Sequence, residues 1–325
     1  MRDRRNEIHM ISGGEKRWQR KYHVQTKTNR KAFIKFYAQD IYAGEQEKYD
    51  RIPKESLDPK DALRIEDRNK LFDGPINVDF GWWQLENGTA MTANPTFFPG
   101  VTGEMFDWWF AWHPIDRLRY ACWDNEDHYD VYLEDSARAV DMSLSMRERH
   151  WGSVHHIWED IGLPGGAGML VISFEEPGKL GYDTSRIDTD ECNALVCANV
   201  KIVGDDETPD IPVVMTHFLR PVEGGSQLQS MFWFGYQIID GKAVKCIPDG
   251  VTIPKEGPIC LLNHNVKEFS NLAKNLARVI CTGERPLGEI TFWSNEYLLL
   301  RNANIVKEKC IYYTANRQND EMCSQ

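Results

Sequence analysis

Near its C-terminal end the sequence carries a single long apolar stripe with the spacing of an α-helix. The stripe recurs every three or four residues and consists of Val266, Phe269, Leu272, Ala273, Leu276 and Ile280. This pattern predicts an amphipathic helix over residues 263–280, with Asn263 as its N-cap. The segment Thr282–Gly283, followed by Pro286, is expected to end it. Such a helix must bury its apolar face, so the rest of the chain has to supply a second layer.

That second layer is predicted upstream, where four segments have the lengths and residue types of β-strands. These segments are residues 168–174, 194–203, 212–219 and 229–239, and turns rich in Gly, Pro and Asp separate them. A shorter helix is expected over residues 102–112, where tryptophans recur with helical spacing. Together these patterns predict an α+β fold in which a curved antiparallel sheet wraps around the long helix.

The composition is typical of a folded globular chain. Of the 325 residues, 42% are hydrophobic and 27% are charged, and no apolar run approaches the ~18 residues of a membrane span. The first ten residues are charged and lack the apolar segment of a secretory signal, so we expect a cytoplasmic protein with no membrane partner. The eight cysteines include no Cys-x-x-Cys pair, which leaves His, Asp and Glu as the source of any metal ligands.

Charge is distributed unevenly along the chain. Residues 1–36 hold eleven Lys and Arg against three Asp and Glu, although the whole chain has a net charge of −11. A basic arm can bind nucleic acid, but no nucleic-acid-binding motif follows it, so we expect no such partner. The acidic remainder disfavours a polyanionic substrate and suits a neutral, aromatic or cationic one.

Changes in composition also divide the chain into regions. Residues 53–67 are rich in Pro and charged residues, and the sequence becomes aromatic and β-branched from residue 77 onward. We therefore expect an N-terminal region over residues 1–80 and a main domain over residues 81–285. An extension whose role the sequence does not indicate follows over residues 286–325.

Several ionisable residues have the spacing of a metal or catalytic site. His264 and Glu268 stand four residues apart on the predicted long helix, so their side chains share one face and can reach the same ion. An ordinary ion pair on a solvated face is the alternative that this spacing leaves open. His128 follows an acidic turn, and Glu159 ends a segment in which His155 offers a rival i,i+4 pairing.

Two further features concern the interior of the protein. His217 lies within the apolar strand predicted over residues 212–219, where a buried histidine needs either a hydrogen-bond partner or a catalytic task. The chain also has 11 Trp, 12 Tyr and 14 Phe. These aromatic side chains either line a cavity for a planar aromatic molecule or fill the core between sheet and helix.

Taken in order, these residues resemble those of a known enzyme family. The matching elements are the segment 105–113, Arg119–Tyr120, His128, Glu159, His217 and the pair His264-x-x-x-Glu268. This set, spread over residues 75–285, resembles the 2,4-diacetylphloroglucinol hydrolase and phloretin hydrolase family. The resemblance implies hydrolysis of the carbon–carbon bond between an acyl group and a polyphenol ring. It also implies a Bet v 1/START-like fold with an elongated hydrophobic cavity, and a homodimer formed through the smaller N-terminal region.

The same resemblance implies roles for individual residues. The expected ligands of a zinc ion are His128, Glu159, His264 and Glu268. The catalytic histidine of the family corresponds to His217, and Tyr120 corresponds to a tyrosine that hydrogen-bonds a substrate hydroxyl. In the mechanism that we expect, Glu159 loosens from the ion and acts as the base on water. His217 then protonates the departing ring carbon or activates the water.

The chain departs from the family pattern at two substrate-binding positions. Val131 stands where the family has an asparagine, and Phe232 stands where a second tyrosine is expected. We expect Tyr236, four residues on, to replace that tyrosine from the same strand face. Loss of polar contacts to ring hydroxyls is typical of a changed substrate. A zinc hydrolase of other β-diketones or esters is therefore one alternative, and a carrier of hydrophobic ligands without catalysis is another.

Overall fold

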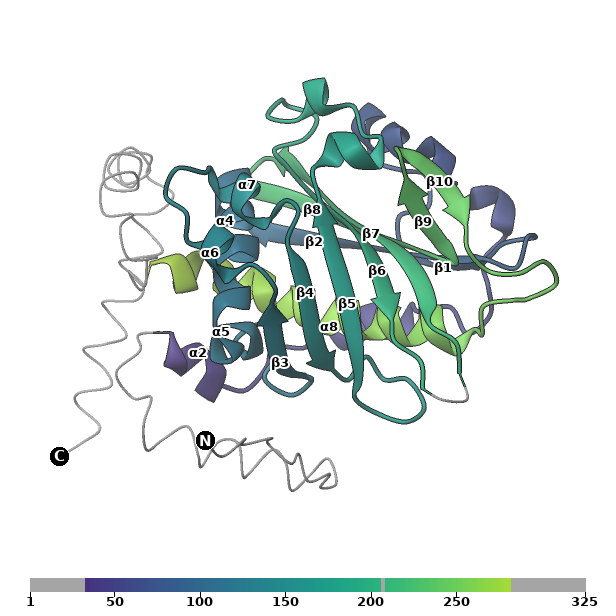
Figure 1. Cartoon of the computed structure of the whole chain (residues 1–325), viewed down its shortest axis with the longest axis horizontal. Helices are drawn as coiled ribbons and strands as arrows, with labels where there is room; N and C mark the ends of the chain where they lie inside the picture. The colour runs from purple at the N-terminus through teal and green to yellow at the C-terminus, as the bar shows by residue number, and fades with distance from the viewer. Residues whose placement is uncertain (1–32, 206–207, 282–325) are drawn as a thin grey trace, which may run out of the picture.

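The computed structural model describes residues 33–205 and 208–281 of the chain. Its centre is an eight-stranded antiparallel sheet with the order β1-β2-β8-β7-β6-β5-β4-β3. The strands are β1 Gly81–Gln84, β2 Ala90–Pro99, β3 His128–Leu133, β4 Val154–Glu159, β5 Gly168–Glu175, β6 Ala194–Ile202, β7 Ile211–Val222 and β8 Gly225–Phe234. The long helix α8 (Glu256–Ile280) runs across one face of this sheet (Figure 1). The predicted α+β arrangement, an antiparallel sheet against a long C-terminal helix, is confirmed.

Shorter elements fill the connections between the strands. The α-helices are α2 Ile34–Ala38, α3 Gln46–Asp50, α4 Gly103–Trp112, α5 Arg117–Ala121, α6 Ser136–Ala139 and α7 Met146–His150. The 3₁₀ helices are η1 Pro59–Asp61, η2 Ile65–Asp73, η3 His113–Ile115, η4 Pro177–Leu180 and η5 Thr184–Arg186. Within the described part of the chain, no helix is both long and apolar enough to cross a bilayer. The basic arm up to residue 32, the expected helix stop at 282–286 and the extension 286–325 lie outside the described residues.

The strand expected over residues 229–239 proves to be two strands. β8 begins earlier, at Gly225, and ends at Phe234, and β9 (Tyr236–Ile239) then pairs with β10 (Lys242–Lys245) in a separate two-stranded sheet. The break falls at Gly235, whose φ of +85° favours glycine. A Cβ atom there would also lie 3.0 Å from the Thr89 side chain. The prediction of one continuous strand was therefore wrong, because Gly235 turns the chain out of the main sheet.

Helix α8 begins seven residues earlier than its apolar stripe indicated. Its first residue is Glu256, so Asn263 is not the N-cap but an interior residue, whose Nδ2 donates to the backbone oxygen of Ile259 at 2.8 Å. Pro258 lies in the first turn, where a missing N–H costs nothing because that group has no intrahelical partner. By contrast, the helix predicted over residues 102–112 is confirmed as α4, capped by the Thr102 side chain.

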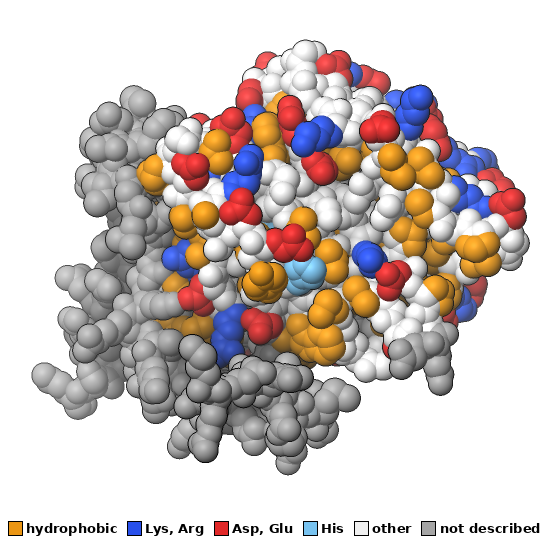
Figure 2. All heavy atoms as spheres, in the orientation of Figure 1, with side chains coloured by type: hydrophobic (Ala, Val, Ile, Leu, Met, Phe, Trp, Pro, Cys, Tyr) orange, Lys and Arg blue, Asp and Glu red, His pale blue; other side chains and the backbone are white. Residues whose placement is uncertain are grey.

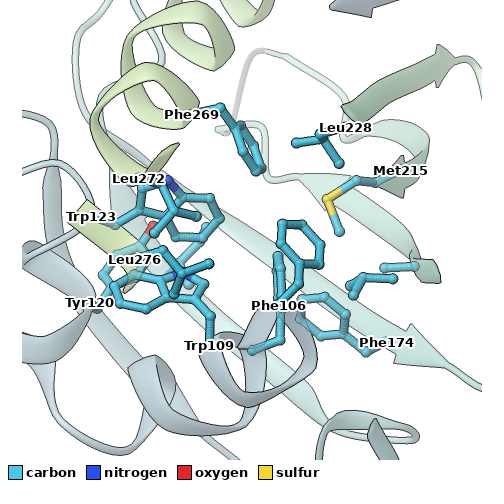
Figure 3. Packing of buried hydrophobic residues seen from close by; sticks show 14 of the residues in the cluster. Phe106, Trp109, Tyr120, Trp123, Phe174, Met215, Leu228, Phe269, Leu272 and Leu276 are labelled. Atoms are coloured by element: carbon cyan, nitrogen blue, oxygen red, sulfur yellow. The ribbon is translucent and has the colours of Figure 1, made fainter. Parts of the chain in front are cut away.

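The main sheet separates two hydrophobic cores. On the side of α8, the helix packs Phe269 and Leu272 toward α4 and its neighbours, where Phe106 and Trp109 lie (Figure 3). On the opposite face, η2 packs against the sheet and Trp233 is buried in the second core. The aromatic residues therefore do fill much of the interior, and the cavity described below lies within the core on the α8 side.

The described part of the N-terminal region belongs to these same cores. Phe33 and Phe36 are buried in the main core, and Phe33 meets Trp112 edge to face with ring centroids 5.3 Å apart. Leu71 and Phe72 of η2 are buried in the second core. Residues 33–80 thus pack on the sheet, and the expected boundary at residue 80 falls directly before β1. That this region forms a dimer stays a prediction.

The edge of the sheet formed by β3 and β4 has one face toward the core and one toward solvent. In β4, His155, Ile157 and Glu159 are buried, and the residues between them are partly exposed. The outer face seen in Figure 2 mixes acidic, basic and hydrophobic side chains over these strands. This alternation places Glu159 on the inner face, toward α8.

Candidate functional site

A cavity lies between the inner face of the sheet and α8. Most of its wall is apolar and aromatic, and it includes Phe110, Phe174, Met215 and Phe232. Another part of the wall carries ionisable side chains, namely Tyr120, His128, Glu159, His217, His264 and Glu268. The structure therefore brings all six predicted ionisable site residues to one cavity, although they come from five different elements.

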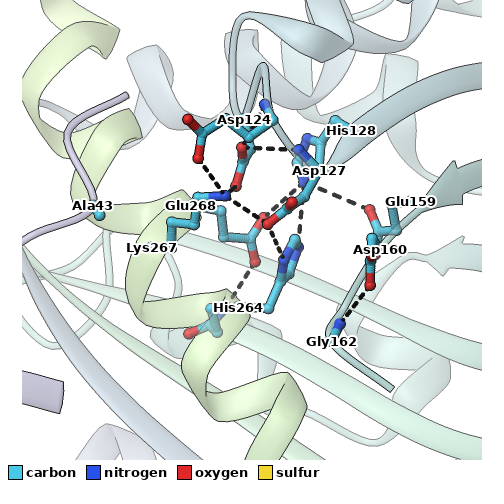
Figure 4. A network of polar contacts seen from close by, with 12 residues as sticks. Ala43, Asp124, Asp127, His128, Glu159, Asp160, Gly162, His264, Lys267 and Glu268 are labelled. Atoms are coloured by element: carbon cyan, nitrogen blue, oxygen red, sulfur yellow. Dashed lines mark hydrogen bonds and ion pairs between the residues drawn. The ribbon is translucent and has the colours of Figure 1, made fainter. Parts of the chain in front are cut away.

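Helix α8 contributes His264 and Glu268. Both side chains are buried and line the cavity, as their i,i+4 spacing on the helix predicts. Burial decides between the two interpretations of this pair, because an ordinary ion pair on a solvated face would leave both groups exposed. Within Figure 4 the two side chains extend from α8 toward β3 and β4.

Strands β3 and β4 contribute His128 and Glu159. His128 opens β3, Glu159 ends β4, and the antiparallel register places these two residues directly opposite each other. A register shift follows between His128 and Asp130. The rival pairing of His155 with Glu159 assumed a helix, and it fails because residues 154–159 form a strand. His155 instead lies 3.1 Å from the Ser153 hydroxyl through its Nε2.

His128, His264 and Glu268 have donor atoms that all lie within 4.8 Å of one another, and Glu159 lies close to His128. The Nε2 atom of His128 lies 3.3 Å from Nε2 of His264, and 3.6 Å from an oxygen of Glu159 and from an oxygen of Glu268. In a tetrahedral zinc site with bonds of about 2.0–2.1 Å, neighbouring ligand atoms are about 3.3–3.5 Å apart. His128, His264 and Glu268 thus have the spacing and the nitrogen and oxygen chemistry that fit a divalent ion such as zinc, and Glu159 lies beside His128 as a further oxygen donor.

The second ring nitrogens of the two histidines support this fit. Nδ1 of His128 faces the backbone oxygen of Tyr120 at 3.4 Å, and Nδ1 of His264 faces a carboxylate oxygen of Asp127 at 3.7 Å. Metal-binding histidines usually direct their non-ligating nitrogen to such an oxygen, which fixes the ring orientation. Both rings therefore turn Nε2 inward, toward the centre of the cluster.

Sequence reasoning missed the role of the acidic turn before His128. The ammonium group of Lys267 lies 2.6 Å from Asp127, 3.3 Å from Asp124 and 3.2 Å from Glu126 (Figure 4). Asp124, Asp127 and His264 also have donor atoms close enough to hold an ion. The Lys267 ammonium already contacts the two aspartates of that second arrangement. We therefore infer that the turn orients the His264 ring through Asp127 and does not hold a separate ion. The i,i+3 spacing from His264 to Lys267 was the available signal.

Burial and charge shift the pKa values of the cluster. Burial raises the pKa of Glu268 to about 8, and it lowers the pKa of His128 well below its ordinary value. Burial also acts to lower the pKa of His264, but Asp127, Glu268 and Glu159 outweigh it and raise that pKa to about 10. Without an ion, the cluster therefore holds protons near its carboxylates, which is the position that a divalent cation would take.

Tyr120 and His217 flank the cluster. The Tyr120 hydroxyl donates a hydrogen bond to Glu159, and its ring stacks on His128 with centroids 4.3 Å apart. His217 lies in the middle of β7, with Nδ1 3.0 Å from the Ser230 hydroxyl and its ring 4.7 Å from that of Phe269. Burial lowers the pKa of His217 to about 3, so its imidazole is neutral at pH 7.

Besides Tyr120, the three predicted substrate-binding positions have different locations. Phe232 lines the cavity and meets the His217 ring edge to face at 5.7 Å. Val131 is half-buried against the main core and is not part of the cavity wall. Tyr236 belongs to β9 and the second core, where its hydroxyl accepts a hydrogen bond from Asn87. The expectation that Tyr236 shares a strand face with Phe232 is therefore wrong, because Gly235 separates the two strands.

Fold and site together define a class of protein. A curved antiparallel sheet and a long helix enclose an apolar cavity, and two histidines and two glutamates converge in its wall. Residues 63–280 match the family model described as the DAPG hydrolase PhiG domain, and the chain therefore belongs to this family. The resemblance seen in the sequence is thus confirmed, and the chain is a hydrolase.

Curated relatives agree with this assignment. Phloretin hydrolase of Eubacterium ramulus is 39% identical over 248 residues, which cover 74% of this chain and 86% of that protein. A 2,4-diacetylphloroglucinol hydrolase of a Pseudomonas species is 32% identical over 173 residues, covering 53% of this chain and 57% of that protein.

Solved structures also match the chain at low identity. Protein CV1439 from Chromobacterium violaceum matches with 14% identity and a TM-score of 0.32, covering 57% of this chain and 96% of that one. Ara h 8.0201 matches with 10% identity and a TM-score of 0.29, covering 55% of this chain and 98% of that one. The family assignment rests on the family model and on the curated relatives.

Proposed function

We propose that this chain is a zinc-dependent hydrolase that cleaves the carbon–carbon bond between an acyl group and a polyphenol ring. The observation that carries the proposal is the buried cluster of His128, Glu159, His264 and Glu268, which faces the same apolar cavity as His217. The names of the relatives favour a phloretin-like ketone or an acylphloroglucinol as substrate. The proposal includes a homodimer in the cytoplasm, as the sequence led us to expect.

The zinc ion would be held by Nε2 of both histidines and by the two glutamate carboxylates. When bound, zinc supplies a Lewis acid that polarises an acyl oxygen or lowers the pKa of water toward ~7. Four protein ligands would fill a tetrahedral site, so one of them has to be replaceable. Glu159 is the ligand that we assign, because its carboxylate already has a second partner in the Tyr120 hydroxyl.

Cleavage of an aryl ketone requires the ring carbon to leave with the bonding electron pair. A 1,3-dihydroxylated ring allows this in its keto tautomer, since the substrate is then a β-diketone and the reaction is a retro-Claisen step. Water adds its oxygen to the acyl carbon, the bond from that carbon to the ring breaks, and the ring carbon gains a proton. The products are a carboxylic acid and the free polyphenol.

The side chains of the cavity move and hold the protons of this reaction. Glu159 accepts a proton from the attacking water at its carboxylate. Glu159 gives up this proton again, and it passes through His217, which is neutral and hydrogen-bonded to Ser230, to the ring carbon. The Tyr120 proton is engaged by Glu159, so the tyrosine oxygen is an acceptor that can orient a ring hydroxyl of the substrate. The aromatic wall around them excludes water.

Metal analysis and product analysis together test the proposal. The purified full-length chain should contain about one zinc per subunit and should convert phloretin into phloroglucinol and a phenylpropionate. A chelator should abolish this turnover, and added zinc should restore it. An ester hydrolase would leave phloretin intact and cleave esters instead. A carrier would bind phloretin without turnover and without stoichiometric zinc, and either of these results would reject the proposal.

A further inference from the structure

We propose that His113 and His155 form a hydroxyl-binding subsite in the cavity, where they accept hydrogen bonds from the phenolic hydroxyls of the substrate. This inference rests on the proposed function and adds the feature by which the cavity would select a polyphenol. Sequence reasoning gave neither residue this task. His113 directly follows the tryptophan-rich helix α4 and begins η3, and His155 was considered only as a partner of Glu159.

The two histidines lie on the cavity wall next to the cluster. Their ring centroids are 6.0 Å apart, and the ring planes are inclined by 75°. The His113 ring stacks on Tyr120 with centroids 5.9 Å apart, and Tyr120 in turn stacks on His128 at 4.3 Å. Only the Tyr120 ring therefore lies between His113 and the His128 side of the cluster, where a substrate ring would bind.

The hydrogen bonds of His113 determine which of its nitrogens carries the proton. Its Nδ1 lies 2.7 Å from the backbone oxygen of Trp109. A carbonyl oxygen can only accept, so Nδ1 must carry the hydrogen, and Nε2 is left with a free lone pair. Among the described residues, no group donates to this Nε2 atom, which leaves it available to a molecule in the cavity.

The same reasoning determines the tautomer of His155. The Ser153 hydroxyl donates to the backbone oxygen of His150 at 2.6 Å, which uses its only proton. The contact of 3.1 Å between Ser153 and Nε2 of His155 must therefore be donated by the imidazole. Nδ1 of His155 is then the bare acceptor, and no donor to it is found in residues 33–205 or 208–281.

Both acceptors are neutral and lie in apolar surroundings. Burial lowers the pKa of His113 to about 3 and lowers that of His155 well below its ordinary value. The His155 ring packs 4.5 Å from Phe174, and His113 packs 5.5 Å from Phe110. An acceptor held in such a wall is costly to leave unpaired, so a ligand that supplies a hydroxyl proton is favoured over one that cannot.

The subsite would supply polar contacts that positions 131 and 232 do not provide. Phe232 lines the cavity at a position where the family resemblance led us to expect a tyrosine, and Val131 lies outside the cavity wall. The cavity therefore needs another source of polar contacts to ring hydroxyls. His113 and His155 provide two acceptors, and a methyl ether, which has no proton to donate, would be rejected.

The test uses variants that keep the structural hydrogen bond and remove the lone pair. In His113→Asn the amide nitrogen occupies the place of Nδ1 and can still donate to Trp109. In His155→Gln the amide nitrogen occupies the place of Nε2 and can still donate to Ser153. His156→Gln is the matched control, because His156 is the neighbour in β4 that faces outward and pairs with Glu134.

Binding of two probe molecules to the zinc-loaded protein is measured by calorimetry. Phloroglucinol carries three hydroxyl donors, and 1,3,5-trimethoxybenzene has the same ring without them. We expect the wild type to prefer phloroglucinol, and each variant to weaken phloroglucinol binding about tenfold while binding of the ether is unchanged. For turnover of phloretin, we expect each variant to have a raised KM and an unchanged kcat. The control variant should behave as the wild type.

Three outcomes separate the subsite from the proposed reaction. An equal loss of both probes would show that the histidines act only in packing, and unchanged binding of both would show no contact with hydroxyls. Either result overturns the subsite, even if the wild type cleaves phloretin. If the wild type shows the preference and the variants abolish it, the subsite stands, whether or not phloretin is cleaved.

Discussion

The carboxylate of Glu268 extends from α8 toward the sheet edge that β3 and β4 form. Its Oε2 lies 3.6 Å from Nε2 of His128, and its Oε1 accepts a hydrogen bond from Asn265. This side chain is therefore placed by its helix and faces a ligand-type atom from β3. The proposal that it binds zinc makes it the most direct residue to test.

Glu268→Gln keeps the size of the side chain and removes its charge. We expect loss of stoichiometric zinc and a decrease in turnover of at least about 100-fold, because an amide is a poor ligand and leaves the ion undercharged. Metal analysis and steady-state kinetics measure both effects. Glu256→Gln, at the exposed start of the same helix, is the control and should be unaffected. A Glu268 variant with full metal and full activity would contradict the assignment.

The pKa values of the cluster predict how the stability of the metal-free protein depends on pH. The pKa of Glu268 is raised from 4.5 to about 8, and that of His264 is raised from 6.5 to about 10. A raised pKa means that the folded state binds more protons than the unfolded state, so stability decreases as pH rises. Below about pH 7 the lowered pKa values of His113, His128, His155 and His217 act in the opposite direction, because these histidines bind protons in the unfolded state only. The decrease should therefore be seen between about pH 7 and pH 10.

Thermal unfolding of chelator-treated protein between pH 7 and pH 10 measures this dependence. The melting temperature should fall across the interval, and His264→Gln should flatten the upper part of the curve. The affinity for zinc should rise with pH over the same range, because the ion displaces these protons. A melting temperature that rises from pH 7 to pH 10 would show that the folded cluster does not retain them.

Sequence alone could predict part of this site, and the reason is local geometry. The i,i+4 spacing placed His264 and Glu268 on one helical face without any further information. His128 and Glu159 are opposite each other only because β3 and β4 pair in one register, which no pattern within either segment specifies. The prediction that His128 and Glu159 share a site with His264 and Glu268 of α8 therefore came from the family resemblance. Tyr236 was misplaced because the turn at Gly235 was not recognised.

At the scale of elements, the types of β5 to β8, α4 and α8 followed from the sequence, whereas their ends did not, and strands β1 to β4 were not predicted. Periodic apolar residues predicted α4 and most of α8, since burial enforces that spacing. The start of α8 was missed because residues 256–262 lie before the stripe begins, and their helical state depends on packing. The short helices near η2 contain too few periodic apolar residues to be predicted from the sequence.

Gly103 shows how closely one element is fitted to another. It begins α4, and a Cβ atom at this position would lie 1.9 Å from the backbone oxygen of Asn193. Gly103→Ala should therefore lower the free energy of unfolding by about 1–3 kcal/mol, as overpacking of a close contact does. Gly168→Ala is the matched control, because a Cβ there meets nothing within 4 Å. Urea denaturation compares the two, and equal stabilities would contradict the close packing of α4.

At the scale of the whole molecule, the N-terminal segment is integrated with the main core. Phe33 is fully buried and packs on Trp112, so it should unfold together with the sheet. We expect Phe33→Ala to lower the free energy of unfolding by about 3–5 kcal/mol. Phe97→Ala, at a phenylalanine that is 46% exposed, should have a much smaller effect.

Denaturant unfolding followed by tryptophan fluorescence and by circular dichroism checks this prediction. Both signals should change in one common transition for the wild type and for the Phe33 variant. A separate early transition that Phe33→Ala alone affects would mean that residues 33–80 unfold as an independent unit. The boundary expected near residue 80 would then be a true domain boundary.

The histidines of the cluster are 136 positions apart in the chain, one at the start of β3 and one in α8. During translation, the ribosome releases the first of them long before the second has been made. A nascent chain that ends before α8 therefore has only half of the donor set and cannot retain an ion. If the cluster binds zinc as proposed, capture of the ion has to wait until the final described helix has been synthesised and packs on the sheet.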